Sequence, residues 1–203
     1  MRRALLISLS LVLALVGWST VCAEEGFYVI PVTRGKYAPV PKTGQTDSST
    51  TGDDGDLQKG VASPTPRFTD NKNGTVTDKL SGLIWLKDAN CFVVKKNWDE
   101  ALTAAATVAN GTCGLTDGSK PGDWRLPNVR ELQSLIDYGR AGPALPDNYP
   151  FTNVQPYFYW SSTTHPDLTL ALAWDVFIGG NGMADGFEKA NPDDYVWCVR
   201  GGK

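Results

Sequence analysis

The clearest pattern of apolar and polar positions lies in residues 123–139, where an extended stretch runs into an amphipathic helix. Asn128 is a helix-capping residue, and Glu131 follows at the spacing of a reciprocal capping box. Gly139 can end the helix in the left-handed conformation. The apolar positions share one helical face: Val129, Leu132, Leu135 and Ile136. The pattern therefore predicts a half-buried helix from Asn128 to Gly139, with Trp124 leading into the core.

A second amphipathic pattern predicts a helix over residues 97–110. Asn97 and Glu100 repeat the capping-box spacing. Small and apolar residues share one face: Trp98, Ala101, Leu102, Ala105 and Ala109. The alanines permit close approach to a sheet or to the other helix.

Between and around these helices, short alternating segments predict β-strands. Residues 67–70 and 75–78 flank a hairpin turn, in which Gly74 can adopt a positive φ. Further strands are expected at residues 83–87, 157–164, 170–178, 183–187 and 195–200. Six tryptophans fall in these elements or at their entries, at positions 85, 98, 124, 160, 174 and 197. Because tryptophan buries a large area, we expect these side chains to build the core.

The first 23 residues are typical of a secretory signal peptide. Two arginines precede the apolar run of residues 4–16, which is too short to span a bilayer, and small residues follow before Ala23. We expect cleavage near Ala23 and a secreted or periplasmic chain. The alternative, a lipoprotein beginning at Cys22, is disfavoured because Val21 is a poor match for the small residue required there.

Residues 24–64 form an extended leader and linker ahead of one domain at residues 65–203. Residues 27–32 could add one strand, whereas residues 43–59 are rich in Thr, Ser, Gly and Asp and are expected to be flexible. The acidic residues 53–56 lack the ligand spacing of a calcium loop. Asp70 and Asp78, at the hairpin, are explained by turn chemistry without a metal.

Charge disfavours nucleic acid as a partner. Without residues 1–23 the chain has 17 basic and 22 acidic residues, a net charge of −5, and no dense basic run. No later segment is long and apolar enough to span a membrane.

Three cysteines remain after cleavage, and an exported chain meets an oxidising compartment. We expect Cys91 to pair with Cys113 across the first helix, which would contribute about 3 kcal/mol to stability. The rival pairings join Cys198 to one of these two. If Cys198 is free, a buried strand residue is a better interpretation than a catalytic thiol.

The sequence offers no assembled catalytic set. His165 is the only histidine, and its nearness to Ser161, Ser162 and Asp167 along one segment does not make a triad. One histidine and three cysteines do not make a zinc site, and no phosphate-binding loop is present. We therefore predict a non-enzyme with no catalytic residues, no metal and no cofactor.

Loops rich in Asn, Asp, Gly and aromatic residues are the candidate binding regions. Such side chains hydrogen-bond to sugar hydroxyls and stack on sugar faces, and loops on a rigid scaffold commonly carry binding. The candidate binding residues are Tyr149, His165, Asn181, Asp185, Asp193 and Asp194.

Five separated motifs resemble the Lcl C-terminal domain family, named for the end domain of a bacterial collagen-like adhesin. They are residues 68–78 (FTDNKNGTVTD), 81–85 (SGLIW), 122–128 (GDWRLPN), 159–164 (YWSSTT) and 196–201 (VWCVRG). The resemblance covers residues 66–202, and residues 27–61 resemble the leader found in some members. It implies an α+β, C-type-lectin-like fold, akin to the scaffold of formylglycine-generating enzymes, with two helices packed on one twisted antiparallel sheet.

The resemblance also implies extracytoplasmic placement, homotrimers and binding of sulfated glycosaminoglycans. The binding of sulfated glycosaminoglycans fits this chain poorly, because the chain has no collagen-like repeat and its domain is acidic. The calcium and sugar motifs of true C-type lectins are absent too. We expect an exported module that binds a glycan or a cell-surface protein. The alternatives are a cell-envelope assembly component that contacts protein and an unrecognised enzyme.

Overall fold

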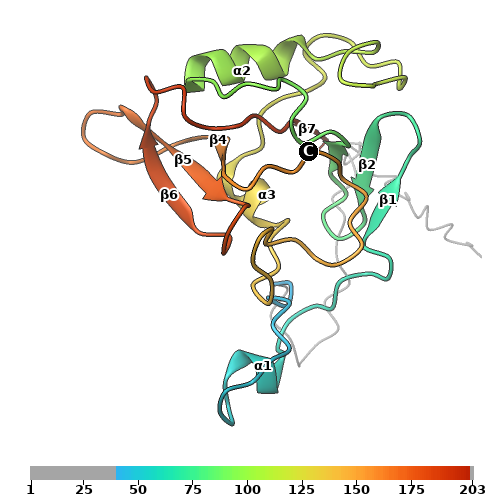
Figure 1. Cartoon of the computed structure of the whole chain (residues 1–203), viewed down its shortest axis with the longest axis vertical. Helices are drawn as coiled ribbons and strands as arrows, with labels where there is room; N and C mark the ends of the chain where they lie inside the picture. Colours follow the sequence, from blue (N-terminus) through green and yellow to red (C-terminus); the bar gives the residue numbers. More distant parts are fainter. Residues whose placement is uncertain (1–39, 202–203) are drawn as a thin grey trace, which may run out of the picture. The chain divides into compact units, whose positions relative to one another are not determined.

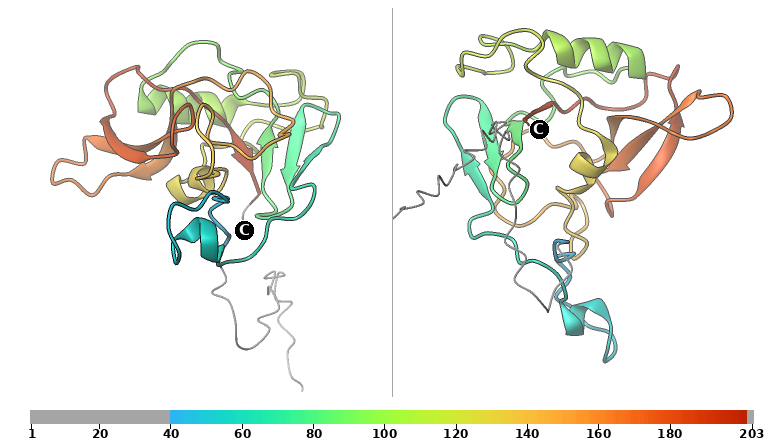
Figure 2. Two further views of the ribbon diagram at one scale, coloured as in Figure 1. Left: turned by 60° about the horizontal axis from the view of Figure 1, so that its bottom comes forward. Right: turned by 180° about the vertical axis from the view of Figure 1, so that it is seen from behind.

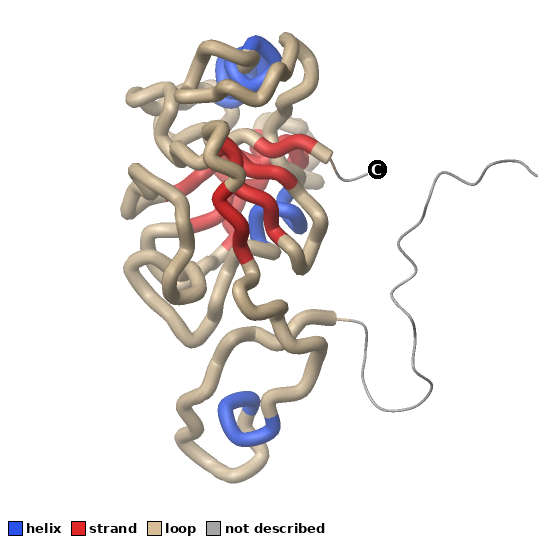
Figure 3. The backbone as a smooth tube through the Cα atoms, turned by 90° about the vertical axis from the view of Figure 1, so that its right-hand side faces the viewer, coloured by secondary structure: helices blue, strands red, loops and turns tan. Residues whose placement is uncertain are grey.

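The computed structural model describes residues 40–201. The expected signal peptide and the leader strand at residues 27–32 lie outside the described residues. Loops make up most of the described backbone, and the short strands gather in its middle (Figure 3). The elements are α1 (Asp54–Leu57), β1 (Phe68–Asp70), β2 (Thr75–Asp78), β3 (Ile84–Leu86), α2 (Trp98–Thr107), α3 (Val129–Gln133), β4 (Phe158–Thr164), β5 (Leu172–Phe177), β6 (Ala184–Glu188) and β7 (Val199–Arg200).

The strands form two antiparallel sheets, so the α+β composition is confirmed but the expected single sheet is wrong. One sheet has the order β1-β2-β3-β7 and the other the order β4-β5-β6. Helix α2 lies along one side of the molecule, while α3 sits between the sheets and contacts β4 and β5 (Figure 1). No helix within residues 40–201 is long and apolar enough to cross a membrane.

Residues 194–200 connect the two sheets. Asp194 bridges to Lys96, and Tyr195 bridges to Tyr159 at the edge of β4. The same segment reaches the other sheet, where Val199 pairs with Trp85 of β3. The strand expected over residues 195–200 is therefore wrong in extent: only β7 is regular, because the preceding residues exchange hydrogen bonds with several different segments.

The β1–β2 hairpin and β3 confirm the sequence prediction. Strands β1 and β2 pair from Phe68 with Asp78 to Asp70 with Val76, and β3 pairs along β2. Gly74 has φ +83° in the turn. A Cβ at this position would lie 2.4 Å from the carbonyl oxygen of Gly114, so both the backbone angle and the space require glycine.

Both predicted capping boxes are present, but the second helix is shorter than predicted. In α2 the Asn97 side chain accepts from the amide of Glu100, and in α3 the Asn128 side chain accepts from the amide of Glu131. Helix α3 ends at Gln133 rather than near Gly139. The chain leaves the helix because the Asp137 amide donates to the carbonyl of Ala144 instead, and Gly139 does not have a positive φ.

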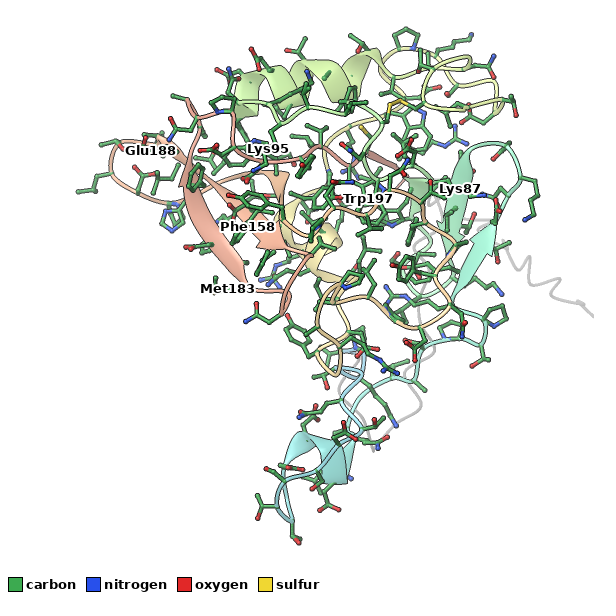
Figure 4. All side chains as sticks on the ribbon, viewed as in Figure 1. Lys87, Lys95, Phe158, Met183, Glu188 and Trp197 are labelled. Atoms are coloured by element: carbon green, nitrogen blue, oxygen red, sulfur yellow. A yellow bond between two sulfur atoms is a disulfide. The ribbon has the colours of Figure 1, made fainter. Side chains whose placement is uncertain are left out.

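Tryptophans build the core, as predicted. Trp85, Trp124, Trp160 and Trp197 are almost fully buried, while Trp98 and Trp174 are half-buried. Trp197 lies between the two sheets (Figure 4), and its indole N–H donates to the carbonyl of Leu86 at 2.8 Å. Its ring packs against those of Trp85, Phe151 and Tyr159 at centroid distances of 5.5, 4.7 and 5.7 Å.

Cys91 and Cys113 form a disulfide, which confirms the predicted pairing over its rivals. The bond closes a loop around α2. Cys198 is free and fully buried just before β7, where its carbonyl accepts from the amide of Leu86 at 3.1 Å. Burial raises the pKa of the Cys198 thiol, so it does not supply a thiolate nucleophile at neutral pH.

A short helix, α1, occurs in the segment 43–59, where the sequence analysis predicted none. The Asp53 side chain caps it by accepting from the amide of Asp56 at 2.9 Å. Hydrogen bonds from Asp56 and Ser49 hold the pKa of the Asp53 carboxyl well below its usual range. Helix α1 projects away from the sheets (Figure 2), and the segment is tied to the domain where the Tyr138 amide donates to the carbonyl of Thr43 at 2.8 Å.

Candidate functional site

The most unusual polar feature is a pair of buried aspartates beside the β4–β6 sheet. Asp175 lies in the middle of β5, and Asp194 begins the segment that connects the sheets. Each residue is only 2% exposed, and their side chains hydrogen-bond to each other. Two carboxylates cannot both be ionised at this contact, so the pair shares a proton.

The pKa values of both groups are raised. Burial raises the pKa of Asp175 to about 6, against the lowering effect of its hydrogen bond from Asp194. Burial and the negative charge of Asp175 raise the pKa of Asp194 to about 8, while the positive charge of Lys95 lowers it. Around neutral pH the pair therefore holds one proton, and the Asp194 Oδ2 atom meets no other hydrogen-bond donor among residues 40–201.

Aromatic and acidic side chains surround this pair. In the strand register Phe158 lies opposite Phe177, and Asp175 lies opposite Asp185, so these side chains share one face of the sheet. The rings of Phe158 and Phe177 stack with centroids 4.6 Å apart and remain partly exposed. The Asp185 amide donates to Asp175 at 3.2 Å. We call the following set the acid–aromatic face: Phe158, Asp175, Phe177, Asp185, Asp193 and Asp194.

Lys95 and two tyrosines adjoin the acid–aromatic face. The Lys95 ammonium lies 3.2 Å from the ring centroid of Tyr157 and 5.6 Å from that of Tyr195. Tyr157 is 39% exposed, and its ring meets that of Phe158 edge-on at 5.7 Å. Lys95 and Phe158 can be followed in Figure 4 beside the β4–β6 sheet.

Three of the six predicted binding residues meet at this face: Asp185, Asp193 and Asp194. Asp185 and Asp193 are exposed, and the negative charge of each raises the pKa of the neighbouring buried carboxyl. The structure therefore places these three predictions together. Asp194 contributes a buried carboxyl, however, rather than the loop surface that the sequence suggested.

The other three predicted residues lie elsewhere. Tyr149 stacks on Phe151 at 6.2 Å, next to the core. Asn181 is exposed in the β5–β6 turn, where its side chain accepts from the Met183 amide. Among residues 40–201, neither side chain forms a hydrogen bond to the buried aspartates.

His165 packs on the opposite face of the sheet from Asp175. Its ring lies 4.6 Å from that of Trp174, the strand neighbour of Asp175, so the two side chains point to opposite sides. Gly186 makes room for the imidazole, since a Cβ there would lie 2.9 Å from the ring. His165 thus does not join the acid–aromatic face.

Sequence reasoning missed Asp175, Lys95 and the paired tyrosines. Residues 170–178 were predicted as a strand, and Asp175 was given no role. Its signal was a lone carboxylate inside the otherwise apolar strand β5, since a buried charge needs a partner or a proton. Lys95 and Tyr157 are more than 60 positions apart in the chain, and nothing local links them.

A polar pocket of about 460 Å³ opens on the other sheet, beside the β1–β2 turn. It contains Lys72 and Lys87, but both ammonium groups pair with Asp70, at 2.8 and 3.0 Å. These bonds hold the pKa of the Asp70 carboxyl below its usual range. Because both ammonium groups already share the single carboxylate of Asp70, and Asp88 also lines the pocket, it is a weaker candidate for an anion than its lysines suggest.

Metal binding has no support from the described side chains. Within residues 40–201, no three His, Cys, Asp or Glu side chains are placed to hold a metal ion. Asp70 and Asp78, considered for calcium, instead bind lysines and a buried arginine.

The buried aspartate pair predicts an unusual pH dependence of stability. The pKa values of both groups are higher in the folded state than the usual 3.8, so the folded state binds protons more tightly than the unfolded state. Stability should fall as pH rises from about 4 through about 8. Denaturant unfolding across this range checks it. Asp194→Asn should flatten the decline, and an unchanged slope in that variant would contradict the assignment.

Comparison with known proteins identifies a family that the chain matches. The model of the Lcl C-terminal domain matches residues 74–200. That range contains α2, α3, every strand except β1, the disulfide and the whole acid–aromatic face. No curated protein and no solved structure matches the chain.

Proposed function

Because the chain belongs to the Lcl C-terminal domain family, we propose that it is an exported, non-enzymatic module that binds carbohydrate through its acid–aromatic face. The scaffold we propose is C-type-lectin-like, with mixed helices and antiparallel strands. The signal peptide expected at residues 1–23 supports export to the periplasm or beyond.

The observation that carries the proposal is the stacked, partly exposed ring pair of Phe158 and Phe177 beside exposed carboxylates. A sugar ring has an apolar face that stacks on aromatic side chains, while its hydroxyls donate to carboxylates. Asp185 and Asp193 are exposed and supply such acceptors. The face therefore offers both kinds of contact that a sugar needs.

The buried aspartates support binding rather than glycoside hydrolysis. Glycosidases hold two carboxyl groups roughly 5–10 Å apart, on either side of the scissile bond. Asp175 and Asp194 are in direct contact and almost wholly buried, so no sugar fits between them. Their arrangement favours a structural role that fixes the exposed acids in place.

A second candidate function, contact with a protein of the cell envelope, is favoured by one observation. The β4–β5 loop exposes Leu168 fully and Leu170 at 61%. Isolated exposed leucines are ordinary, but two at the tip of one hairpin suit a protein contact. Pull-down from an envelope fraction, repeated with Leu168→Ser/Leu170→Ser, tests this candidate.

A glycan array at low salt, with and without calcium, tests the carbohydrate proposal. We expect binding to at least one glycan class, and a double variant Asp185→Ala/Asp193→Ala should bind about tenfold more weakly, because two acceptors for hydroxyl groups are lost. Asp99→Ala, an exposed aspartate on α2, is the matched control and should bind as the unchanged chain does. Absence of binding to every glycan, or equal loss in the control, would count against the proposal.

A further inference from the structure

Lys95 occupies a site that could hold a ligand cation. Its ammonium lies 3.2 Å from the centroid of Tyr157 and 5.6 Å from that of Tyr195, and these two rings meet edge-on at 6.4 Å. Aromatic faces attract ammonium groups through their negative π-surface. Within residues 40–201 no carboxylate lies within ion-pair distance of Lys95, so the rings are its direct partners.

The charges around this ammonium favour a cation. Lys95 lowers the pKa of Asp194, which shows that its charge acts on the buried aspartate pair. The acid–aromatic face contains four aspartates, and apart from the contact between Asp175 and Asp194 the buried Asp194 Oδ2 atom has no hydrogen-bond partner among the described residues. If the Lys95 ammonium left and no other cation replaced it, the negative charge of these four aspartates would therefore be less balanced by positive charge.

Lys95 can leave without disturbing the fold. Lysine has a flexible four-carbon stem with a strongly hydrated head, so the ammonium can move into water by side-chain rotation alone. The neighbouring Val93 and Val94 are 72% and 59% exposed, so this part of the chain borders solvent. Tyr157, once uncovered, would still lie edge-on to the rings of Phe158 and Tyr195.

We propose that the Tyr157–Tyr195 ring pair is an ammonium site, which Lys95 fills in the free chain, and that the carbohydrate bound is one with free amino groups. This inference rests on the proposed function. Tyr157 and Phe158 are in edge-on contact, with ring centroids 5.7 Å apart, so a sugar that covers Phe158 borders Tyr157. A hexosamine in that position would present its ammonium group to the Tyr157 ring, which Lys95 covers in the free chain.

Calorimetry with three tetrasaccharides tests this inference: a glucosamine tetramer, its N-acetylated form and a glucose tetramer. At about pH 6 the free amines are charged. The full chain should bind the glucosamine tetramer about fivefold more tightly than the N-acetylated one. Lys95→Ala removes the internal competitor and should raise the affinity for the glucosamine tetramer about fivefold again, with no change for the N-acetylated form. Tyr157→Ala should abolish the preference.

The matched control is Lys120→Ala. Lys120 is exposed, and the loop that contains it follows α2, whereas Lys95 precedes that helix. Equal strengthening by both alanine variants would mean that overall charge drives binding, and would overturn the ammonium site. A preference for the N-acetylated or glucose tetramer would overturn this inference while the proposed function stands. Binding of no sugar at all would overturn both.

Discussion

Replacing Asp78 with alanine is expected to lower the free energy of unfolding by about 3–5 kcal/mol. Asp78 is fully buried in β2, and Arg67, 8% exposed, donates to it from two nitrogens at 3.0 and 2.8 Å. The hydroxyl of Ser81 also donates to Asp78 at 2.8 Å. Without the carboxylate, Arg67 would remain as an uncompensated buried charge.

Denaturant unfolding, followed by tryptophan fluorescence, measures the loss. Asp147→Ala is the matched control, because Asp147 also pairs with an arginine, Arg140, but both side chains are more than half exposed. Exposed pairs of this kind contribute below about 1 kcal/mol. A loss at Asp78 no greater than that at Asp147 would refute the reasoning. The double variant Arg67→Met/Asp78→Leu should recover part of the stability, since it leaves no buried charge unpaired.

Trp197→Ala is expected to cost about 3–5 kcal/mol as well, through a different mechanism. The side chain is fully buried between the sheets and touches three aromatic rings. Its removal opens a large cavity and leaves the carbonyl of Leu86 without its indole donor. Thermal and denaturant unfolding both report the change.

A pair of phenylalanine variants separates packing from hydrogen bonding. Trp85 is as deeply buried as Trp197, but its indole N–H has no acceptor among residues 40–201. Trp197→Phe should therefore destabilise more than Trp85→Phe, by about 1–3 kcal/mol, because only the first removes a made hydrogen bond and leaves a buried carbonyl unsatisfied. Equal losses of stability in the two variants would mean that packing, and not the indole hydrogen bond, determines the cost of each substitution.

Features encoded within a few residues were predictable from the sequence. The capping boxes at Asn97 and Asn128 and the positive φ of Gly74 depend on local spacing and are confirmed. The Cys91–Cys113 pairing joins residues 22 positions apart; it was preferred over its rivals because the two cysteines flank the first helix, and it is confirmed as well. Burial of the tryptophans followed from their size. The family resemblance is confirmed over residues 74–200.

Features that depend on distant partners were not predictable. The end of α3 is set by the carbonyl of Ala144, and the two sheets are connected by residues 194–200, which bond to four separate segments. In the same way, Asp175 became a candidate only when the fold placed Asp194 against it. The site combines strands β4 to β6 with two loops. The periodicity of apolar and polar positions along the chain gives no information on the contacts between these separate segments.

The segment 194–200 has a consequence for how the chain matures. It contributes β7 to the β1-β2-β3-β7 sheet and an isolated bridge to β4, so that sheet is complete only when these residues have been synthesised. Native contacts that join residues 84–96 to residues 194–200 span most of the domain, and such high contact order slows folding. The pairing of β3 with β7 therefore forms only after nearly the whole domain has been synthesised. The Cys91–Cys113 disulfide, by contrast, joins residues 22 positions apart, so both of its cysteines are present long before this sheet can be completed.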